Sequence, residues 1–336
     1  MALPGFGGRA VTLRNASRLL AGALLICPLA PASAAEGPSI AGPIGGTDVR
    51  SATLPPPGLY AGAIALWADA FRFVDGQGNL IPALSDARLD RVTGGPFVVY
   101  VPDVQVLGGS VGLAGFQPMG RLCGRLFATA PKICQTGLGD PYIEAAWSRS
   151  FGTLRPSRHP GAFPILEGLS IKLAFGVVVP IGQYNATSAI TKALSSGTNI
   201  WDFAPSIAVT YTTPAILAEG TEFSFKTYWN NYLTNPATGY STGTIINTDF
   251  AITERIGRFQ IGVAGYYLHQ IADDKINGVP VAPDGIRAKI LSLGGVLVYD
   301  MPEHGTSIKV KALQTVRATS NVYTHAVVVG FFKKLR

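Results

Sequence analysis

Long segments in which apolar residues alternate with polar or small ones constrain this chain more than any other sequence feature. In residues 171–179 the odd positions are bulky and apolar, and the even positions are mostly small but include Lys172. Residues 201–211 and 221–230 alternate in the same way. A period of two places successive side chains on opposite faces of a β-strand. The chain is therefore predicted to be all-β.

A soluble β-sandwich would show the same alternation, but three further features favour a membrane barrel. The segments reach about ten residues, the length of a tilted transmembrane strand, whereas strands of globular proteins usually have about 5–6. The polar faces carry charges and small residues, which suit a wet lumen better than a dry core. Aromatic residues lie near the segment ends, as at a membrane interface; they are Trp201, Phe203, Tyr211, Trp229, Tyr267 and Tyr299.

The composition agrees with a membrane protein that lacks membrane-spanning helices. Of the 336 residues, 47% are hydrophobic and only 14% are charged, against about 25% charged in an average soluble domain. Past residue 34 no stretch approaches the roughly 18 apolar residues that a spanning helix needs. Because only helices and closed barrels satisfy every backbone amide in lipid, a barrel remains.

Residues 1–34 have the three parts of a secretory signal peptide. A basic region ends at Arg18, an apolar run follows over residues 19–26, and Ala32-Ser33-Ala34 supplies the small residues that a signal peptidase requires. We predict export with cleavage before Ala35, rather than a short anchor helix. Without the leader arginines, 24 basic and 20 acidic residues leave a net charge of +4. This is too mild to indicate a nucleic-acid partner.

After the leader, residues 35–57 are rich in Gly, Pro, Ser, Ala and Thr, which is typical of a flexible linker or a plug segment. Residues 58–332 are predicted to form a closed antiparallel transmembrane β-barrel, and residues 333–336 a basic tail. About twelve strands are expected, an even number as in single-chain bacterial barrels. They are placed at 58–73, 96–101, 104–117, 139–152, 165–180, 199–212, 221–233, 241–255, 258–272, 286–300, 305–318 and 321–332.

The connections between these strands fall into two classes if residue 58 lies on the periplasmic side. Short periplasmic turns are expected at 102–103, 255–257 and 301–304. Long external loops are expected at 74–95, 118–138, 181–198 and 273–285, which is the usual asymmetry of such barrels. The connections at 153–164 and 319–320 depart from it.

Charged residues on the strands are predicted to face the lumen, because a cation against lipid costs about 2–4 kcal/mol near the midplane. The pattern of residues 308–313 continues to Thr315 and Arg317, which places these two on the polar face as well. Such groups could pair with one another or line a path for solute, and the sequence leaves both alternatives open. The lumen-lining candidates are Glu144, Lys172, Asp202, Glu222, Lys226, Asn230, Asp249, Lys309 and Lys311.

Cys123 and Cys134 are the cysteines that remain after the leader is removed. In an oxidising envelope compartment, such a pair at short spacing indicates a disulfide. Free or metal-binding thiols are the alternative, but neither a further Cys nor a His lies nearby. The four histidines also lack the spacing of metal ligands, so no metal or cofactor is predicted.

A hydrolase embedded in the barrel wall would need a His beside a Ser on the outer face of neighbouring strands. His269 has no such partner that the sequence reveals. Catalysis is therefore not expected, and the chain is not predicted to be an enzyme.

Several motifs, taken in order, carry a resemblance to a known family. They are Gly137-Leu138-Gly139-Asp140-Pro141 before Trp147, then residues 179–184 (VPIGQY), Asn199-Ile200-Trp201, residues 231–243 (NYLTNPATGYSTG), and residues 265–274 (GYYLHQIADD) before Leu293-Gly294-Gly295. Over roughly residues 54–332 the chain resembles the outer-membrane transporter family named for the MetA pathway of phenol degradation. The resemblance implies a barrel in outer-membrane lipid that admits hydrophobic or aromatic molecules.

Barrels of this type usually finish on an aromatic residue that the outer-membrane assembly machinery reads, whereas here Phe331-Phe332 precedes four further residues. The sequence thus predicts an exported outer-membrane channel for passive passage of small molecules. A structural or adhesive surface barrel that acts through its outer loops is the alternative from a different class. A barrel-embedded hydrolase is a third.

Overall fold

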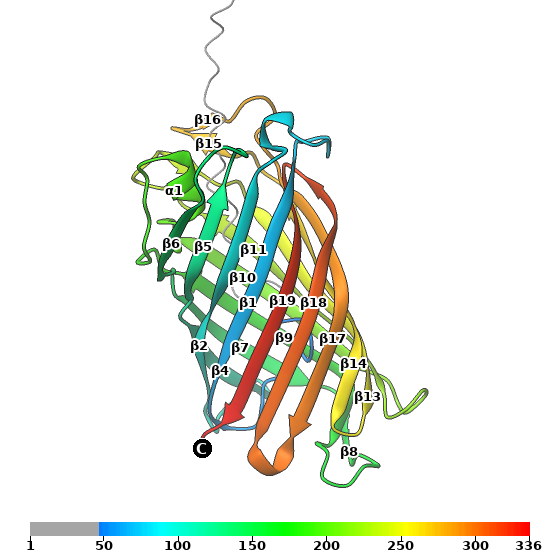
Figure 1. Ribbon diagram of the computed structural model, residues 1–336. Coiled ribbons are helices and arrows are strands. Elements are labelled where there is room, and N and C mark those ends of the chain that lie inside the picture. Colours follow the sequence, from blue (N-terminus) through cyan, green and yellow to red (C-terminus); the bar gives the residue numbers. More distant parts are fainter. Residues whose placement is uncertain (1–46) are drawn as a thin grey trace, which may run out of the picture. The chain divides into compact units, whose positions relative to one another are not determined.

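The computed structural model describes residues 47–336, whose main sheet is antiparallel and closes on itself, with a separate small sheet of three short strands (Figure 1). Twelve strands make the wall, in the order β1, β2, β4, β7, β9, β10, β11, β13, β14, β17, β18 and β19, and β19 pairs back with β1. The predicted closed antiparallel barrel is confirmed. The proposed signal peptide and residues 35–46 lie outside the described residues.

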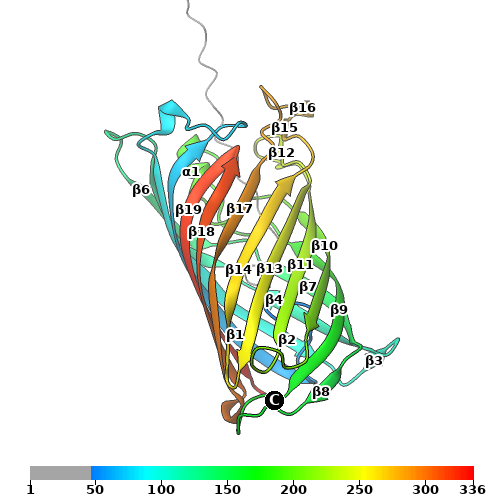
Figure 2. The same cartoon turned by 90° about the vertical axis from the view of Figure 1, so that its right-hand side faces the viewer.

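Most wall strands are longer than strands of soluble proteins, which run to about 5–6 residues. They are β1 (Gly58–Val74), β2 (Arg88–Val101), β4 (Gly109–Phe116), β7 (Tyr142–Ser150), β9 (Ile165–Val178), β10 (Asp202–Thr212), β11 (Thr221–Tyr232), β13 (Ile245–Ile256), β14 (Phe259–Gln270), β17 (Lys289–Met301), β18 (Thr306–Thr319) and β19 (Asn321–Lys334). Figure 2 presents the side formed by β13, β14 and β17.

The remaining elements are short. The strands are β3 (Gln105–Val106), β5 (Met119–Arg125), β6 (Ile133–Leu138), β8 (Thr153–Arg155), β12 (Tyr240–Ser241), β15 (Lys275–Ile276) and β16 (Val279–Pro280), and the helices are α1 (Ala189–Ala193), η1 (Pro82–Leu84) and η2 (Pro302–His304). No helix within residues 47–336 is both long and apolar enough to cross a membrane.

The region around β2 and β5 differs from the sequence prediction. β2 begins at Arg88 rather than at residue 96, and residues 118–138, expected as a loop, contain the hairpin of β5 and β6. Residues 88–94 of β2 pair with β5, so the two strands extend the wall together. The charged residues Arg88, Asp90 and Arg91 and the pair Gly94-Gly95 hide the alternation of apolar and polar residues in the first half of β2. Cys123 and Cys134 face each other across the β5–β6 hairpin and form a disulfide.

The C-terminal residues also differ from the expected tail. β19 continues to Lys334, and Lys333 pairs with Ala61 of β1 and Thr306 of β18. The backbone N–H of Leu59 donates to the carbonyl of Arg336 at 3.0 Å. The residues after Phe331-Phe332 therefore complete the edge of the sheet at which β1 begins. Following the expectation for residue 58, we call this the periplasmic end of the barrel and the opposite end the external end.

The two faces of the wall differ in the way that a membrane barrel requires. On β9 the side chains of Leu173 and Phe175 point outward and are 50% and 51% exposed. On β10 the inward residues Asp202, Ser206 and Thr210 are buried. An apolar outer face and a polar inner face match a wall between lipid and lumen.

Candidate functional site in the barrel lumen

The segment just before β1 lies against the inner face of the barrel. We call residues 47–54 the inner segment. The backbone N–H of Ala52 donates to Thr210 Oγ1 on β10 at 3.1 Å, and its carbonyl accepts from Ser148 Oγ on β7 at 2.6 Å. Val49 packs on a small apolar cluster from β13, β14 and β17. The inner segment thus contacts strands on both sides of the lumen.

Asp48 anchors the inner segment to β18. Its carboxylate accepts from Lys311 Nζ at 2.6 Å and from Lys309 Nζ at 3.0 Å. The side chains of Asp48 and Lys311 are both 0% exposed. Burial alone would raise the pKa of Asp48, but the two ammonium groups hold it below its ordinary value. The contact is therefore a fully desolvated ion pair at neutral pH.

Arg50 makes a second anchor close to the periplasmic ends of the strands. Its Nη2 lies 2.6 Å from Asp300 Oδ2 on β17, and its Nε donates to Gln260 Oε1 on β14 at 2.9 Å. Its backbone N–H donates to Glu222 Oε1 on β11 at 2.7 Å. The backbone of Arg50 has φ 53°, a left-handed conformation that is uncommon for a residue with a side chain. Contacts from three strands stabilise this conformation.

A further ion pair lies within the wall itself. Lys226 Nζ of β11 is 2.5 Å from Glu144 Oε2 of β7, and the Tyr142 hydroxyl donates to the same oxygen. The Lys226 ammonium also lies 4.5 Å from the ring centroid of Tyr228. Lys226 is 1% exposed. Its charge is thus neutralised by the neighbouring wall.

The residues predicted to line the lumen all lie on inward positions of their strands. Asp249 accepts from Thr47 of the inner segment, and Glu222 accepts from Arg50. Asp202 and Asn230 are buried near the external ends of β10 and β11. Lys172 and Lys309 are partly exposed. Most of these charged groups therefore contact a protein partner and leave little free charge for solute.

Arg317 of β18 was predicted to lie on the polar, lumen-facing side of its strand, but it lies on the outward side. Leu291 of β17 pairs with Arg317, whereas the next residue, Ser292, pairs with Thr315. The skipped residue, Val316, is a β-bulge in β18 that shifts the alternation by one position. Arg317 therefore points outward with Leu291, and the prediction that continued the pattern to Arg317 was wrong.

Sequence reasoning missed Arg91, whose side chain faces the lumen. Arg91 pairs with Ala68 of β1, and Ala68 pairs with Ala326 of β19, which pairs with the buried Leu313. Arg91 is exposed, and it makes no ion pair within residues 47–336. The mixed charges of residues 88–91 resembled a loop, which concealed this inward position.

Apolar side chains form part of the inner wall toward the external end. Ile245 begins β13, Leu268 lies near the end of β14, and Ile290 lies near the start of β17. With Tyr266, Ala288 and Leu313 they form one buried cluster, against which Tyr232 packs. The inward side chains of these strands in the outer half are therefore apolar and aromatic, and they pack against one another.

The comparison with known families agrees with this architecture. The family described as "Putative MetA-pathway of phenol degradation" matches residues 70–326. The chain belongs to this family. The resemblance inferred from the sequence motifs is confirmed. None of the curated proteins matches the sequence.

Solved structures that resemble this phenol-degradation family member are outer-membrane barrels. The COG4313 outer membrane channel from Pseudomonas putida F1 is 13% identical with a TM-score of 0.68, over 85% of this chain and 98% of that chain. The transport unit of the autotransporter AIDA-I from Escherichia coli is 8% identical with a TM-score of 0.47, over 86% and 93% of the two chains. The first likeness shows the fold, and the second adds nothing to it.

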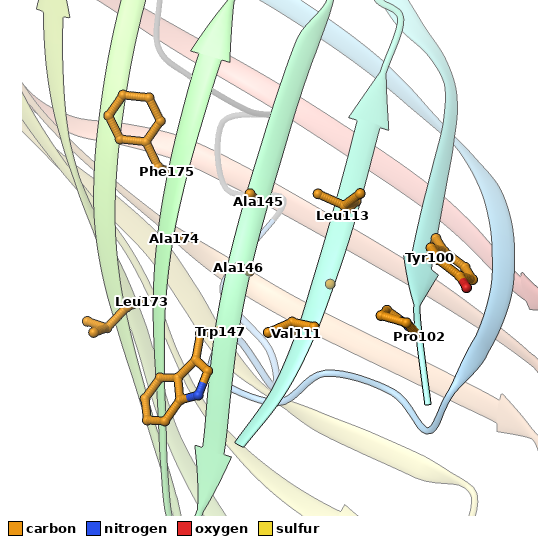
Figure 3. Close-up of a pocket in the computed structure, with 11 residues that line it drawn as sticks. Tyr100, Pro102, Val111, Leu113, Ala145, Ala146, Trp147, Leu173, Ala174 and Phe175 are labelled. Atoms are coloured by element: carbon orange, nitrogen blue, oxygen red, sulfur yellow. The ribbon is translucent and has the colours of Figure 1, made fainter. Parts of the chain in front are cut away.

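The outer face of this family member has a shallow groove that is separate from the lumen (Figure 3). It lies over Ala145 and Ala146 and is bordered by Tyr100, Leu113, Trp147, Leu173 and Phe175. Tyr100, Leu113, Leu173 and Phe175 are exposed on the lipid-facing side of the wall, and Trp147 is partly exposed. The groove therefore belongs to the lipid-facing surface.

Proposed function

We propose that this family member is an outer-membrane channel for passive passage of small hydrophobic or aromatic molecules. The observation that carries the proposal is the division of the lumen. Ion pairs hold the inner segment in the periplasmic half, whereas inward side chains of the outer half form the buried apolar cluster around Leu268, Ile290 and Leu313. An apolar wall in a vestibule favours solutes that bury apolar surface.

The inner segment acts in this proposal as a removable plug. Asp48 and Arg50 hold it at two places, to β18 and to β17. Desolvation offsets much of the attraction in a buried ion pair. Such pairs therefore fix the position of the segment without making its release prohibitively costly.

The proposed role is not catalytic. His269 points outward from β14, and its cross-strand neighbours are Ile246 and Lys289. Neither carries a hydroxyl group that His269 could activate. Ester cleavage by the purified barrel that His269→Ala abolishes would contradict this view. We further infer that the chain is exported, its leader is removed, and the outer-membrane assembly machinery inserts it.

Uptake in cells tests the proposal directly. A strain that lacks the gene and a complemented strain are compared for uptake of radiolabelled aromatic and aliphatic solutes. We expect slower uptake of at least one aromatic solute without the gene. Unchanged uptake of every solute would contradict the proposal.

Conductance separates the channel from a structural or adhesive barrel. The purified chain and a variant without residues 35–57 are inserted in planar bilayers. Folding is verified by the shift in gel mobility on boiling in detergent. A folded barrel that conducts in neither form would favour the structural or adhesive role.

A further inference from the structure

Basic residues form a band on the outer face of one side of the barrel. We call Arg72, Arg88, Arg125, Lys289 and Arg317 the basic rim. All five are exposed, and they lie at or near the external ends of β1, β2, β5, β17 and β18. With β19, these strands are consecutive in the sheet (Figure 1). The basic rim is therefore a continuous surface.

The strand register shows that these side chains point away from the lumen. Arg72 pairs with Tyr323, and its guanidinium lies 5.1 Å from the ring centroid of that tyrosine. Arg317 is turned outward by the bulge at Val316. Arg88 lies four residues before the half-exposed, outward Val92 on β2, so the two side chains are on the same face of the strand. The basic rim thus faces the surrounding membrane at its external boundary.

The basic rim has no carboxylate partner among the described residues, although Nη1 of Arg88 donates to the backbone carbonyls of Phe71, Ser85 and Ala87. Arg88 and Arg125 stand directly opposite each other on β2 and β5. Like charges in this position destabilise a sheet unless an anion lies between them. Within residues 47–336, none of the five makes an ion pair. The nearby Asp90 is paired with Lys132 at 2.8 Å, and Asp69 lies one row deeper on this face.

The other side of the barrel lacks this charge. At the external ends of β10, β11 and β14 the outward residues are Trp201, Phe203, Trp229 and Tyr267. In the described chain, no Lys or Arg lies on the outward face at those ends. Neutral aromatic residues are the usual interfacial residues of such barrels. The basic rim is therefore an addition to the general interfacial pattern.

We propose that the basic rim binds the phosphate groups of a glycolipid in the outer leaflet. Guanidinium groups form bidentate hydrogen bonds with phosphate oxygens. Just below the rim, Trp67, Val92 and Val327 are 46%, 50% and 42% exposed. These side chains give the acyl chains of the same lipid an apolar surface. Phosphate above and hydrocarbon below match the two parts of one phosphorylated lipid.

Native mass spectrometry on the purified full chain in a phosphate-free detergent tests this proposal. The probes are diphosphoryl lipid A and the same lipid after removal of its phosphates. Each rim cation near a membrane surface contributes about 1 kcal/mol to binding anionic lipid. We expect the variant Arg125→Gln/Arg317→Gln to bind diphosphoryl lipid A about thirtyfold more weakly, with unchanged binding of the dephosphorylated lipid.

The matched control is Arg149→Gln/Lys333→Gln, which removes two exposed cations at the periplasmic ends of β7 and β19. It should bind diphosphoryl lipid A as the original protein does. Arg125→Gln should also leave thermal stability unchanged or raise it in the absence of lipid, because it removes the repulsion with Arg88. Equal loss in rim and control variants, or no preference for the phosphorylated lipid, would overturn the proposal.

Discussion

The periplasmic and outer halves of the lumen are built in different ways. In the periplasmic half, Asp48 and Arg50 of the inner segment make ion pairs with β18 and β17. In the outer half, apolar side chains such as Leu268 and Ile290 line the wall, and Arg91 makes no ion pair within the described chain. Charge thus fixes the protein's own segment at one end, while apolar packing builds the inner wall at the other.

Breaking the anchor at Asp48 should have the largest effect on this difference. Asp48→Ala leaves Lys311 fully buried with no carboxylate partner. Removal of one partner of a buried pair costs about 3–5 kcal/mol. We expect release of the inner segment and a several-fold rise in single-channel conductance. In Asp48→Ala/Lys309→Met/Lys311→Met the three charges of this anchor are absent, so conductance should return toward that of the original protein.

Breaking the wall pair should lower stability without opening the lumen. Lys226→Met leaves the carboxylate of Glu144 buried, although the Tyr142 hydroxyl still donates to it. We therefore expect a loss at the lower end of the range for such pairs, about 3 kcal/mol in urea unfolding. The double variant Lys226→Met/Glu144→Leu should recover most of it. A conductance increase as large as that of Asp48→Ala would mean that the two kinds of pair do not differ.

Acid should weaken the periplasmic end of the wall through Glu219, in the turn between β10 and β11. Its side chain is 2% exposed and accepts from the backbone N–H groups of Arg158 and Gly257. Burial raises its pKa, but these hydrogen bonds and those from Ser157 and His159 outweigh burial and lower it to about 2.

Because the folded pKa of Glu219 lies below its ordinary value of 4.5, its contribution is complete above that pH and disappears as the pH falls toward about 2. We expect the original protein to lose about 2–3 kcal/mol more than Glu219→Gln over this interval in urea unfolding. Parallel pH profiles for the two proteins would contradict the assignment.

Removal of Arg91 should produce the smallest change, and only in the outer half. Arg91→Gln takes away a lumen-facing positive charge, so the preference of the channel for anions over cations should fall by about twofold. Reversal potentials in a salt gradient measure this ratio. Arg121→Gln, which removes an exposed cation of β5 paired with the outward Val92, is the control and should leave the ratio unchanged.

Much of the wall could be predicted from the sequence because alternation is a local property. Residues 171–179 and 201–211 reveal their inward and outward positions without knowledge of their neighbours, since side chains alternate along any strand. The same reasoning failed at Arg317, where a bulge adds one residue. It also failed at the start of β2. Residues 88–91 contain three charged residues and one apolar residue, so no apolar face can be recognised there.

The partners of the charged residues could not be predicted in the same way. Lys226 and Glu144 are 82 residues apart, and Lys311 and Asp48 are 263 apart. Nothing in the inner segment indicates a particular strand, because its composition is that of a linker. Its opposite charges at Asp48 and Arg50 were the available signal, and they point to an anchor only once the facing strands are known.

The sequence by itself determined that this protein is an all-β chain with one face for lipid and another for polar groups, because side-chain alternation and the need to pair every backbone amide act locally. Only the tertiary structure decided which charges meet, where the basic rim runs, and that residues 47–54 lie in the lumen. These features depend on closure of the sheet, which brings distant strands around a common interior.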